Sequence, residues 1–289
     1  MMSVDSFATV SRRPLGWLGG ALLAAWVGSV QADPAPGRYG CERPVSLALY
    51  QNRVFYSDGQ GIDPDLVAEL QRRSGCMFEV SVLPRSEIWA RLEAGTLDMS
   101  TSGIATPERR RFAFFVPYLY LRNKLIVPTT LVAQVESFAD FARLPGARLG
   151  VVASYRHGPY LDSGVRILRG EGRVLEFVDD AARFAALRSG EVSALIGHDL
   201  NLSGALPAEE QLNYRVIDVV PGPAVPHGLI LARQRFTPAQ AAEWLRLLEG
   251  VRLDGRLAGI MRAHAAPGLA EELLNSGYHY ELAKQGRQP

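Results

Sequence analysis

The sequence predicts an α/β protein with two lobes, on three observations. From Pro44 onward, short apolar runs alternate with helical patterns across short links, which is typical of a mainly parallel sheet flanked by helices. The same alternation starts again after residue 130. Two extended segments, 123–132 and 227–233, stand where the chain would pass between the units. We therefore expect two crossings and these bounds: a discontinuous first lobe at 41–128 plus 228–285, and a second lobe at 130–225.

The first unit follows the order strand, helix, strand, helix, strand. We expect strands at 45–50, 78–83 and 97–103, and helices at 63–75 and 86–95. Asp63 and Pro64 suit the start of the first helix as N-cap and first-turn proline. Ligands of such sheets bind at the carboxyl ends of the strands, which here lead into Tyr50, Arg85 and Ser102.

The second unit has the same character. We expect strands at 147–153, 173–178 and 192–199, and helices at 137–144 and 179–190. The segment 154–161 reads as a turn that opens a further helix, and the chain after residue 236 is helical.

The N-terminus carries an export signal, predicted at 1–32. Arg12 and Arg13 precede an apolar run, and Val30-Gln31-Ala32 suits cleavage. The alternative is a membrane anchor, but the run is shorter than the ~20 residues that a span needs. We expect the periplasm as the destination. Ser11-Arg12-Arg13 is a weak sign of twin-arginine export, so the general secretory route is favoured.

The only two cysteines, Cys41 and Cys76, are predicted to form a disulfide. Each stands just before an apolar run, and an exported chain meets an oxidising compartment. If the two runs are neighbouring parallel strands, their entry points lie side by side. A metal site needs more ligands than two cysteines, and no histidines cluster near them, so no metal is expected.

Composition argues against several classes of function. The 289 residues carry a net charge of +1, so nothing global favours nucleic acid or an anionic membrane. Nucleophile-elbow, zinc-protease, phosphate-loop and dinucleotide motifs are absent from the sequence. We expect no cofactor and no catalytic residues.

Thr106-Pro107-Glu108 reads as a helix start, with Arg109 one turn in. A helix N-terminus together with a guanidinium would make an anion site. Arg110 and Arg111 follow, and at 3.6 residues per turn the three arginines cannot all face one cleft. We therefore assign the anion to Arg109 and leave the other two to solvent or to contacts between the lobes. The alternative is that all three form a solvated face.

The order of several motifs resembles the type II periplasmic solute-binding proteins, in particular family 3, the amino-acid-binding branch of ABC transporter receptors. The match is specific in the first lobe and weaker in the second. The motifs are G-x-D-x-D-L from Gly61 to Leu66, L-x-x-G-x-x-D from Leu92 to Asp98, T-x-E-R from Thr106 to Arg109, F-x-x-P-Y from Phe114 to Tyr118, then Gly150-Val151-Val152 and the segment from Gly190 to Asp199.

This resemblance implies a two-lobed Venus-flytrap fold that closes on a ligand held between the lobes. In the amino-acid binders, the arginine that Arg109 matches takes the ligand's carboxylate. An acid at the position of Asp199 takes the ammonium. Asp199 is also suited to cap a helix at 200–206, and both roles can hold together.

The chain departs from the family pattern at three places. Apolar Ile104 replaces a common hydroxyl donor, so its backbone, Gly103 and Ser102 are the remaining candidates there. Arg85 stands near a position that is usually aromatic in the family. This suggests a second anionic group on the ligand or stacking on Tyr50; a surface or interlobe salt bridge is the alternative.

The third departure lies in the second lobe. The turn Ser154-Tyr155-Arg156-His157 would close over the ligand, with His157 as a contact or a surface residue. Trp89 is assigned to the core, with a platform for the ligand as the alternative.

The resemblance implies a non-enzymatic, monomeric receptor for a small carboxylate-bearing solute, an amino acid or related organic acid. An ABC permease or a signalling protein would be its partner. The alternative is a periplasmic cyclohexadienyl or prephenate-type dehydratase on the same scaffold. Glu87 or Asp199 would then be the general acid, but the Gly-Gly-Thr-Asn-type turn of those enzymes is missing.

Overall fold

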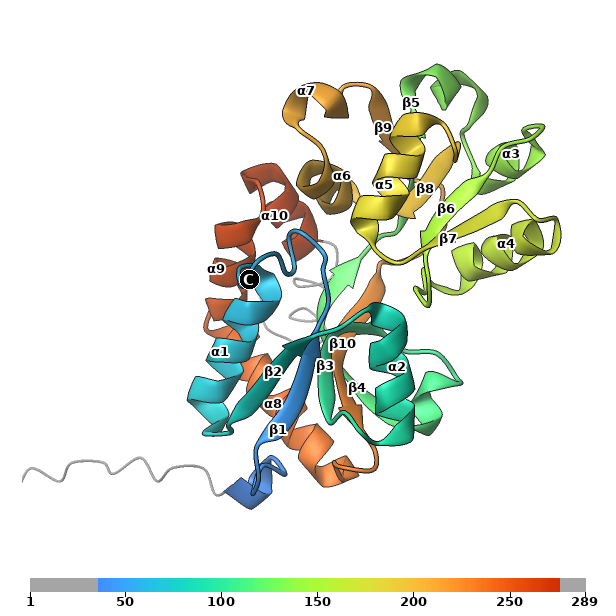
Figure 1. Cartoon of the computed structure of the whole chain (residues 1–289). Helices are drawn as coiled ribbons and strands as arrows, with labels where there is room; N and C mark the ends of the chain where they lie inside the picture. The colour runs from blue at the N-terminus through green and yellow to red at the C-terminus, as the bar shows by residue number, and fades with distance from the viewer. Residues whose placement is uncertain (1–35, 276–289) are drawn as a thin grey trace, which may run out of the picture. The chain divides into compact units, whose positions relative to one another are not determined.

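Two five-stranded sheets form the framework of the protein (Figure 1). The structure is a computed structural model, and it describes residues 36–275. The strand order is β2-β1-β3-β10-β4 in the first sheet and β7-β6-β8-β5-β9 in the second. Both sheets lie within one of the chain's two units, Pro34–Pro289. The export signal expected at 1–32 lies outside the described residues.

The first sheet is mixed. Its strands are β1 (Val45–Leu49), β2 (Phe78–Val82), β3 (Met99–Ile104), β4 (Ala113–Leu121) and β10 (Val225–Ala232). β1 pairs in parallel with both β2 and β3, as the strand-helix-strand pattern predicts. β10 returns from far along the chain and pairs antiparallel with β3 and β4.

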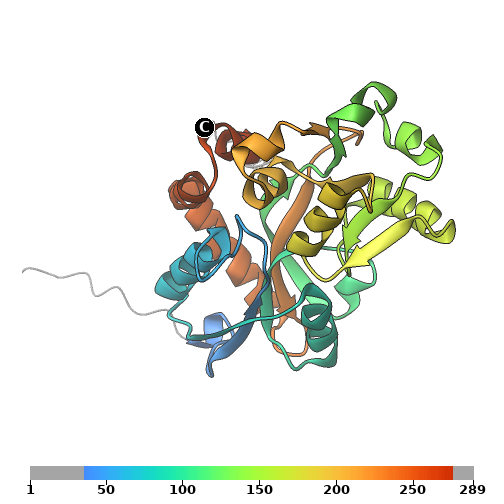
Figure 2. The same cartoon turned by 45° about the horizontal axis from the view of Figure 1, so that its top comes forward.

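Helices cover both faces of the first sheet (Figures 1 and 2). They are α1 (Ile62–Ser74), α2 (Arg85–Ala94), α8 (Pro238–Leu253), α9 (Arg256–His264) and α10 (Pro267–Leu273). Both faces need a covering layer because successive side chains along β1 point to opposite faces of the sheet. Leu47 and Leu49 join the core that includes α1, α8 and α9, whereas Ala48 joins the core under α2.

The second sheet is built in the same way. Its strands are β5 (Lys124–Pro128), β6 (Leu149–Val152), β7 (Val174–Phe177), β8 (Ala194–Gly197) and β9 (Tyr214–Ile217). Its helices are α3 (Phe138–Arg143), α4 (Pro159–Gly170), α5 (Asp180–Ser189), α6 (Asp199–Ala205) and α7 (Ala208–Gln211). β6 is parallel to β7 and β8, and β5 is antiparallel to β8 and β9. The sequence pattern did not predict β9.

Two connections join the sheets, one between β4 and β5 and one between β9 and β10. Arg122 in the first connection donates hydrogen bonds to the carbonyls of Val220 and Gly222 in the second. The two crossings are therefore tied to each other. The exact lobe bounds given above stay a prediction.

Two local predictions were wrong. Asp63 is not an N-cap: α1 begins at Ile62, after Gly61 at a φ of 135°, and the Asp63 side chain turns into the protein. Thr106 does cap a turn, because its hydroxyl accepts from the Arg109 N–H at 3.2 Å, but that turn is not an α-helix. It leads into one 3₁₀ turn, η2 (Arg109–Arg111), because the chain must turn back into β4 at once. The predicted contribution of a helix N-terminus to an anion site is therefore lost.

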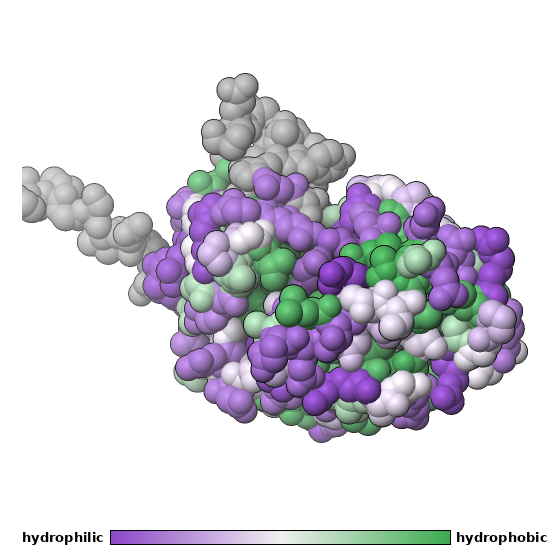
Figure 3. Space-filling model, turned by 90° about the horizontal axis from the view of Figure 1, so that it is seen from above, coloured by the Kyte–Doolittle hydropathy of each residue, from purple (hydrophilic) through white to green (hydrophobic). Residues whose placement is uncertain are grey.

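Apolar residues form small groups among hydrophilic ones on the face shown in Figure 3. Within residues 36–275, none of the helices combines the length and apolar character that a membrane span requires.

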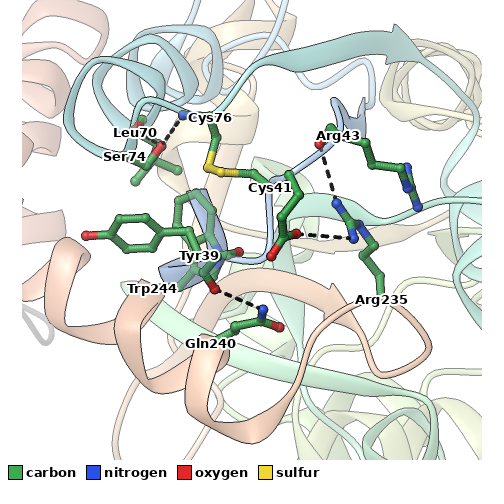
Figure 4. The surroundings of a disulfide bond; sticks show 11 residues. Tyr39, Cys41, Arg43, Leu70, Ser74, Cys76, Arg235, Gln240 and Trp244 are labelled. Atoms are coloured by element: carbon green, nitrogen blue, oxygen red, sulfur yellow. Dashed lines mark hydrogen bonds and ion pairs between the residues drawn. A yellow bond between two sulfur atoms is a disulfide. The ribbon is translucent and has the colours of Figure 1, made fainter. Parts of the chain in front are cut away.

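The disulfide between Cys41 and Cys76 is confirmed (Figure 4). Cys41 leads into β1 and Cys76 leads into β2, and the parallel pairing of these strands brings the two Cα atoms to 5.5 Å. The ring of Trp244 packs beside Tyr39, and its indole N–H donates to the Tyr39 carbonyl. The bridge thus fastens the start of the described chain to the first core.

We expect the double variant Cys41→Ser, Cys76→Ser to lose about 3–4 kcal/mol of unfolding free energy, because the bridge closes a loop of 35 residues. Urea denaturation of the oxidised protein and the variant measures the difference. A reductant should lower the midpoint of the wild type and leave the variant unchanged. Equal midpoints would show that the bridge adds nothing to stability.

Candidate functional site

A small cavity of about 50 Å³ lies among residues from both sheets, close to the carboxyl ends of β1, β3, β6 and β8. Of the ten predicted ligand-binding residues, the ones that line it are Tyr50, Arg85, Ser102, Ile104, Arg109, Ser154, Tyr155 and His157. Gly103 lies in β3 against the side chain of Ile230, and Asp199 lies on α6; neither lines the cavity.

Arg156, part of the turn expected to close over the ligand, also lines the cavity. The other lining residues were not chosen from the sequence: Asn52, Phe55, Leu121, Asn123, Ile196, His198, Asn201 and His227. The rule that ligands bind after strand ends could have found Asn52, after β1, and His198, after β8. His227 lies inside β10 opposite Ile104, and only the pairing of distant strands brings it to the cavity.

Arg85 begins α2, and its side chain is 5% exposed. Its guanidinium carbon lies 4.4 Å from the ring centre of Tyr50 and 4.9 Å from that of Trp89. It donates hydrogen bonds to the carbonyls of Thr101 and Ser102, at 3.1 and 3.2 Å. Of the sequence-based alternatives, the structure has the stacked arrangement rather than a surface salt bridge.

Arg109 is 7% exposed and lies over the other part of the site. Its guanidinium carbon is 3.6 Å from the ring centre of Trp89, so the core tryptophan also supports both arginines. Arg109 donates to the carbonyls of Ile104, at 2.9 Å, and Ser154, at 2.6 Å. Because Ser154 follows β6, this side chain joins residues of the two sheets.

These buried cations have no carboxylate partner in the described part of the chain. All the hydrogen-bond acceptors of Arg85 and Arg109 there are neutral oxygens. Asp63 acts on Arg85, and Asp162 and Glu108 act on Arg109, only through longer-range attraction. Burial, then Arg85 and Arg156, lower the pKa of Arg109 to about 8, so the guanidinium is still mostly charged at neutral pH. The cavity therefore holds positive charge that an anion would neutralise.

Two buried acids of the fold, Asp63 and Asp180, are held by other groups. Asp63 accepts hydrogen bonds from the hydroxyls of Thr101, Ser102 and Tyr118, and burial raises its pKa to about 6. Asp180 pairs with Arg183 and accepts from Asn201.

Asp199 is the first residue of α6, and His198 is the N-cap, so the predicted capping role of Asp199 was wrong. Its carboxylate lies 2.7 Å from Lys124 Nζ, which also bonds Glu272 of α10 at 2.6 Å. The side chain is thus held in an ion-pair cluster outside the cavity.

Three histidines line the cavity in neutral form. Burial lowers the pKa of His157 to about 3 and that of His227 to about 4, and it lowers the pKa of His198 well below its ordinary value. Arg183, Arg156 and Arg109 add to the effect at His157. Within residues 36–275, no group of three or more metal-binding side chains is placed to hold an ion.

The family model of the bacterial extracellular solute-binding proteins, family 3, matches residues 50–198, a little over half of the chain. The protein belongs to this family. The matched segment runs from Tyr50 to His198, both of which line the cavity. The family predicted from the sequence motifs is confirmed, and its description places its members outside the cell.

Solved structures of similar fold agree. The arginine-, lysine-, histidine-binding protein ArtJ from Geobacillus stearothermophilus has a TM-score of 0.64 and 20% identity, over 79% of this chain and 99% of that one. The GluR0 ligand-binding core from Nostoc punctiforme, in complex with L-glutamate, has a TM-score of 0.63 and 16% identity, over 78% of this chain and 100% of that one. The ancestral amino acid-binding protein AncCDT-1, a precursor of cyclohexadienyl dehydratase, has a TM-score of 0.61 and 18% identity, over 76% of this chain and 95% of that one.

At these identities the likeness shows the fold alone, and the two-lobed periplasmic-binding-protein fold predicted from the sequence is confirmed. The comparison with curated proteins gave no match.

The buried histidines give this family member a pH dependence. Because the folded pKa of His157 is depressed to about 3, the unfolded chain binds one proton more between pH 6.5 and about 3. Stability is therefore lost as the pH falls below 6.5, by about 1.4 kcal/mol per pH unit for this residue.

We expect His157→Asn to reduce the slope of unfolding free energy against pH by about that amount between pH 6 and 4.5. Urea denaturation at four pH values gives both slopes. Asp63, whose raised pKa acts in the opposite direction, is common to both proteins and cancels. Identical slopes would mean that His157 titrates normally in the folded protein.

Proposed function

We propose that the protein is a receptor that captures a small carboxylate-bearing solute between its two lobes. The observation that carries this proposal is the pair of buried guanidiniums, Arg85 and Arg109, that share one cavity and have only neutral acceptors. A carboxylate there gains charge-assisted hydrogen bonds and relieves the repulsion between two buried cations. Membership of a solute-binding family supports the same reading.

Arg109 is the main carboxylate-binding residue in this proposal. In the structure its guanidinium donates to the Ser154 carbonyl, which belongs to the second lobe. The ligand's carboxylate takes the place of that carbonyl as the acceptor, and contacts from Ser154, Tyr155 and His157 then hold the second lobe closed over the ligand. Tyr50, Arg85 and Ser102 form the floor on the first lobe.

The receptor acts as a monomer after export to the periplasm, and it delivers the solute to an ABC permease or signals through another protein. The family supports a location outside the cell. ArtJ is an arginine-, lysine- and histidine-binding protein, and the GluR0 core binds L-glutamate, so small amino acids and organic acids are the first ligands to test.

We propose binding without catalysis. The two general acids suggested for a dehydratase lie away from the cavity: Glu87 pairs with Arg91 at 2.5 Å on an exposed part of α2, and Asp199 pairs with Lys124. Neither carboxyl is placed to protonate a leaving hydroxyl of a solute bound at Arg109. The likeness to AncCDT-1 is itself a likeness to a binding protein.

We expect no phenylpyruvate when the mature chain is incubated with prephenate at neutral pH. Absorbance of the product in alkali, followed beside an enzyme-free blank, measures it. Turnover above the blank that is lost in Arg109→Gln would assign the site to catalysis instead.

We expect Arg109→Gln to weaken binding about 10- to 150-fold, because the variant loses a charge-assisted hydrogen bond worth about 1.5–3 kcal/mol. Titration calorimetry with the strongest binder from a panel of amino acids and dicarboxylates measures the change. Arg111→Gln is the matched control, since Arg111 lies in the same turn with an exposed side chain.

An unchanged affinity in Arg109→Gln would remove Arg109 from the site. A panel without any binder, tested up to millimolar concentration, would contradict the proposed function as a whole.

A further inference from the structure

We infer that the ligand is a small dicarboxylate without an ammonium group, rather than an α-amino acid. This inference rests on the proposed function, and it limits the expected ligands to dianions. It is carried by what lines the cavity: two buried guanidiniums and, among the described residues, no acidic side chain.

An amino-acid ligand needs a negative group for its ammonium. Moving an unpaired ammonium out of water is costly, and a neighbouring guanidinium raises that cost. No Asp or Glu is among the described residues that line the cavity. The site is therefore unsuited to a buried ammonium.

Four acids of the surrounding structure already bind other groups of the protein. Asp63 already accepts from three hydroxyl groups, and Asp180 is bound to Arg183. Asp199 is paired with Lys124 outside the cavity. Asp162 accepts the backbone N–H of His157 and lines the neighbouring groove instead. Turning any of them inward would break an interaction that the fold already uses.

Arg85 supplies the place for a second carboxylate. The carbonyls of Thr101 and Ser102 anchor its guanidinium, and the rings of Tyr50 and Trp89 fix its plane. Such a stacked, tethered arginine loses little conformational entropy when it binds an anion. With Arg109 over the same Trp89 ring, two cations are available to one ligand.

Several of the remaining polar side chains of the cavity can serve as hydrogen-bond donors: Asn52, Asn123, Tyr155 and the neutral imidazole of His157. His227 is different, because its Nδ1–H donates to the Val225 carbonyl at 2.9 Å and leaves Nε2 of the neutral ring as an acceptor. Donors such as the first four satisfy carboxylate oxygens beyond those that a guanidinium reaches. They add no negative charge for an ammonium, so these donors favour a dianion.

The test compares ligands that differ only in the ammonium. The mature chain is titrated calorimetrically with succinate and L-aspartate, and with glutarate and L-glutamate. We expect at least one dicarboxylate to bind 10-fold or more tightly than its amino-acid counterpart. An amino acid that binds as tightly or more tightly overturns the inference and leaves the proposed function intact. If none of the four binds, the dicarboxylate inference fails, and the wider panel above decides the proposed function separately.

Arg85→Gln tests the second carboxylate. We expect it to weaken glutarate binding at least 10-fold while the affinity for valerate, which has the same chain length and one carboxylate, changes less than 3-fold. Arg91→Gln, on the exposed side of the same helix, is the matched control. Equal losses for glutarate and valerate would overturn the assignment, because they would show that Arg85 only supports the fold.

Discussion

The site depends on two guanidiniums that are buried against one tryptophan ring and that form no ion pair with a carboxylate of residues 36–275. Arg85 and Arg109 both lie over Trp89, and both are satisfied by backbone carbonyls. Neutral oxygens and an aromatic face keep these cations folded into the protein, and the carboxylates that attract them, Asp63 for Arg85 and Asp162 and Glu108 for Arg109, form no ion pair with them. A binding protein gains from such an arrangement, because the anion that completes it is the ligand.

The first sheet is shaped to hold these groups. The parallel pairing of β1 with β2 and β3 places the strand ends from which Tyr50 and Ser102 reach the cavity, and the disulfide joins the opposite ends of β1 and β2. Ser102 and Ser154, at φ values of 53° and 66°, are two of the three described non-glycine residues with a positive φ. Both line the cavity and both give their carbonyl to an arginine, so backbone strain is concentrated where the acceptors must be aimed.

Much of this could be predicted from the sequence, for identifiable reasons. The hydrophobic periodicity and the turn residues predict the strands of the first lobe. The rule that ligands bind at the carboxyl ends of parallel strands predicts Tyr50, Arg85, Ser102 and Arg109 as site residues. His227 was missed because β10 returns to β3 from more than a hundred residues away, and local patterns carry no such information. Asp63 was misjudged as a cap because only the tertiary fold reveals the three hydroxyls that bind its carboxylate.

The most direct test of this account is the unfolding free energy of the ligand-free Arg109→Gln variant, measured in urea at neutral pH beside the wild type. If Arg109 is a buried, uncompensated cation kept for the ligand, the loss of its two hydrogen bonds is offset by the loss of buried charge. The two proteins should then agree within about 1 kcal/mol, or the variant should be more stable. A loss of more than about 3 kcal/mol would contradict the account, because Arg109 would then be a structural residue that the fold itself requires.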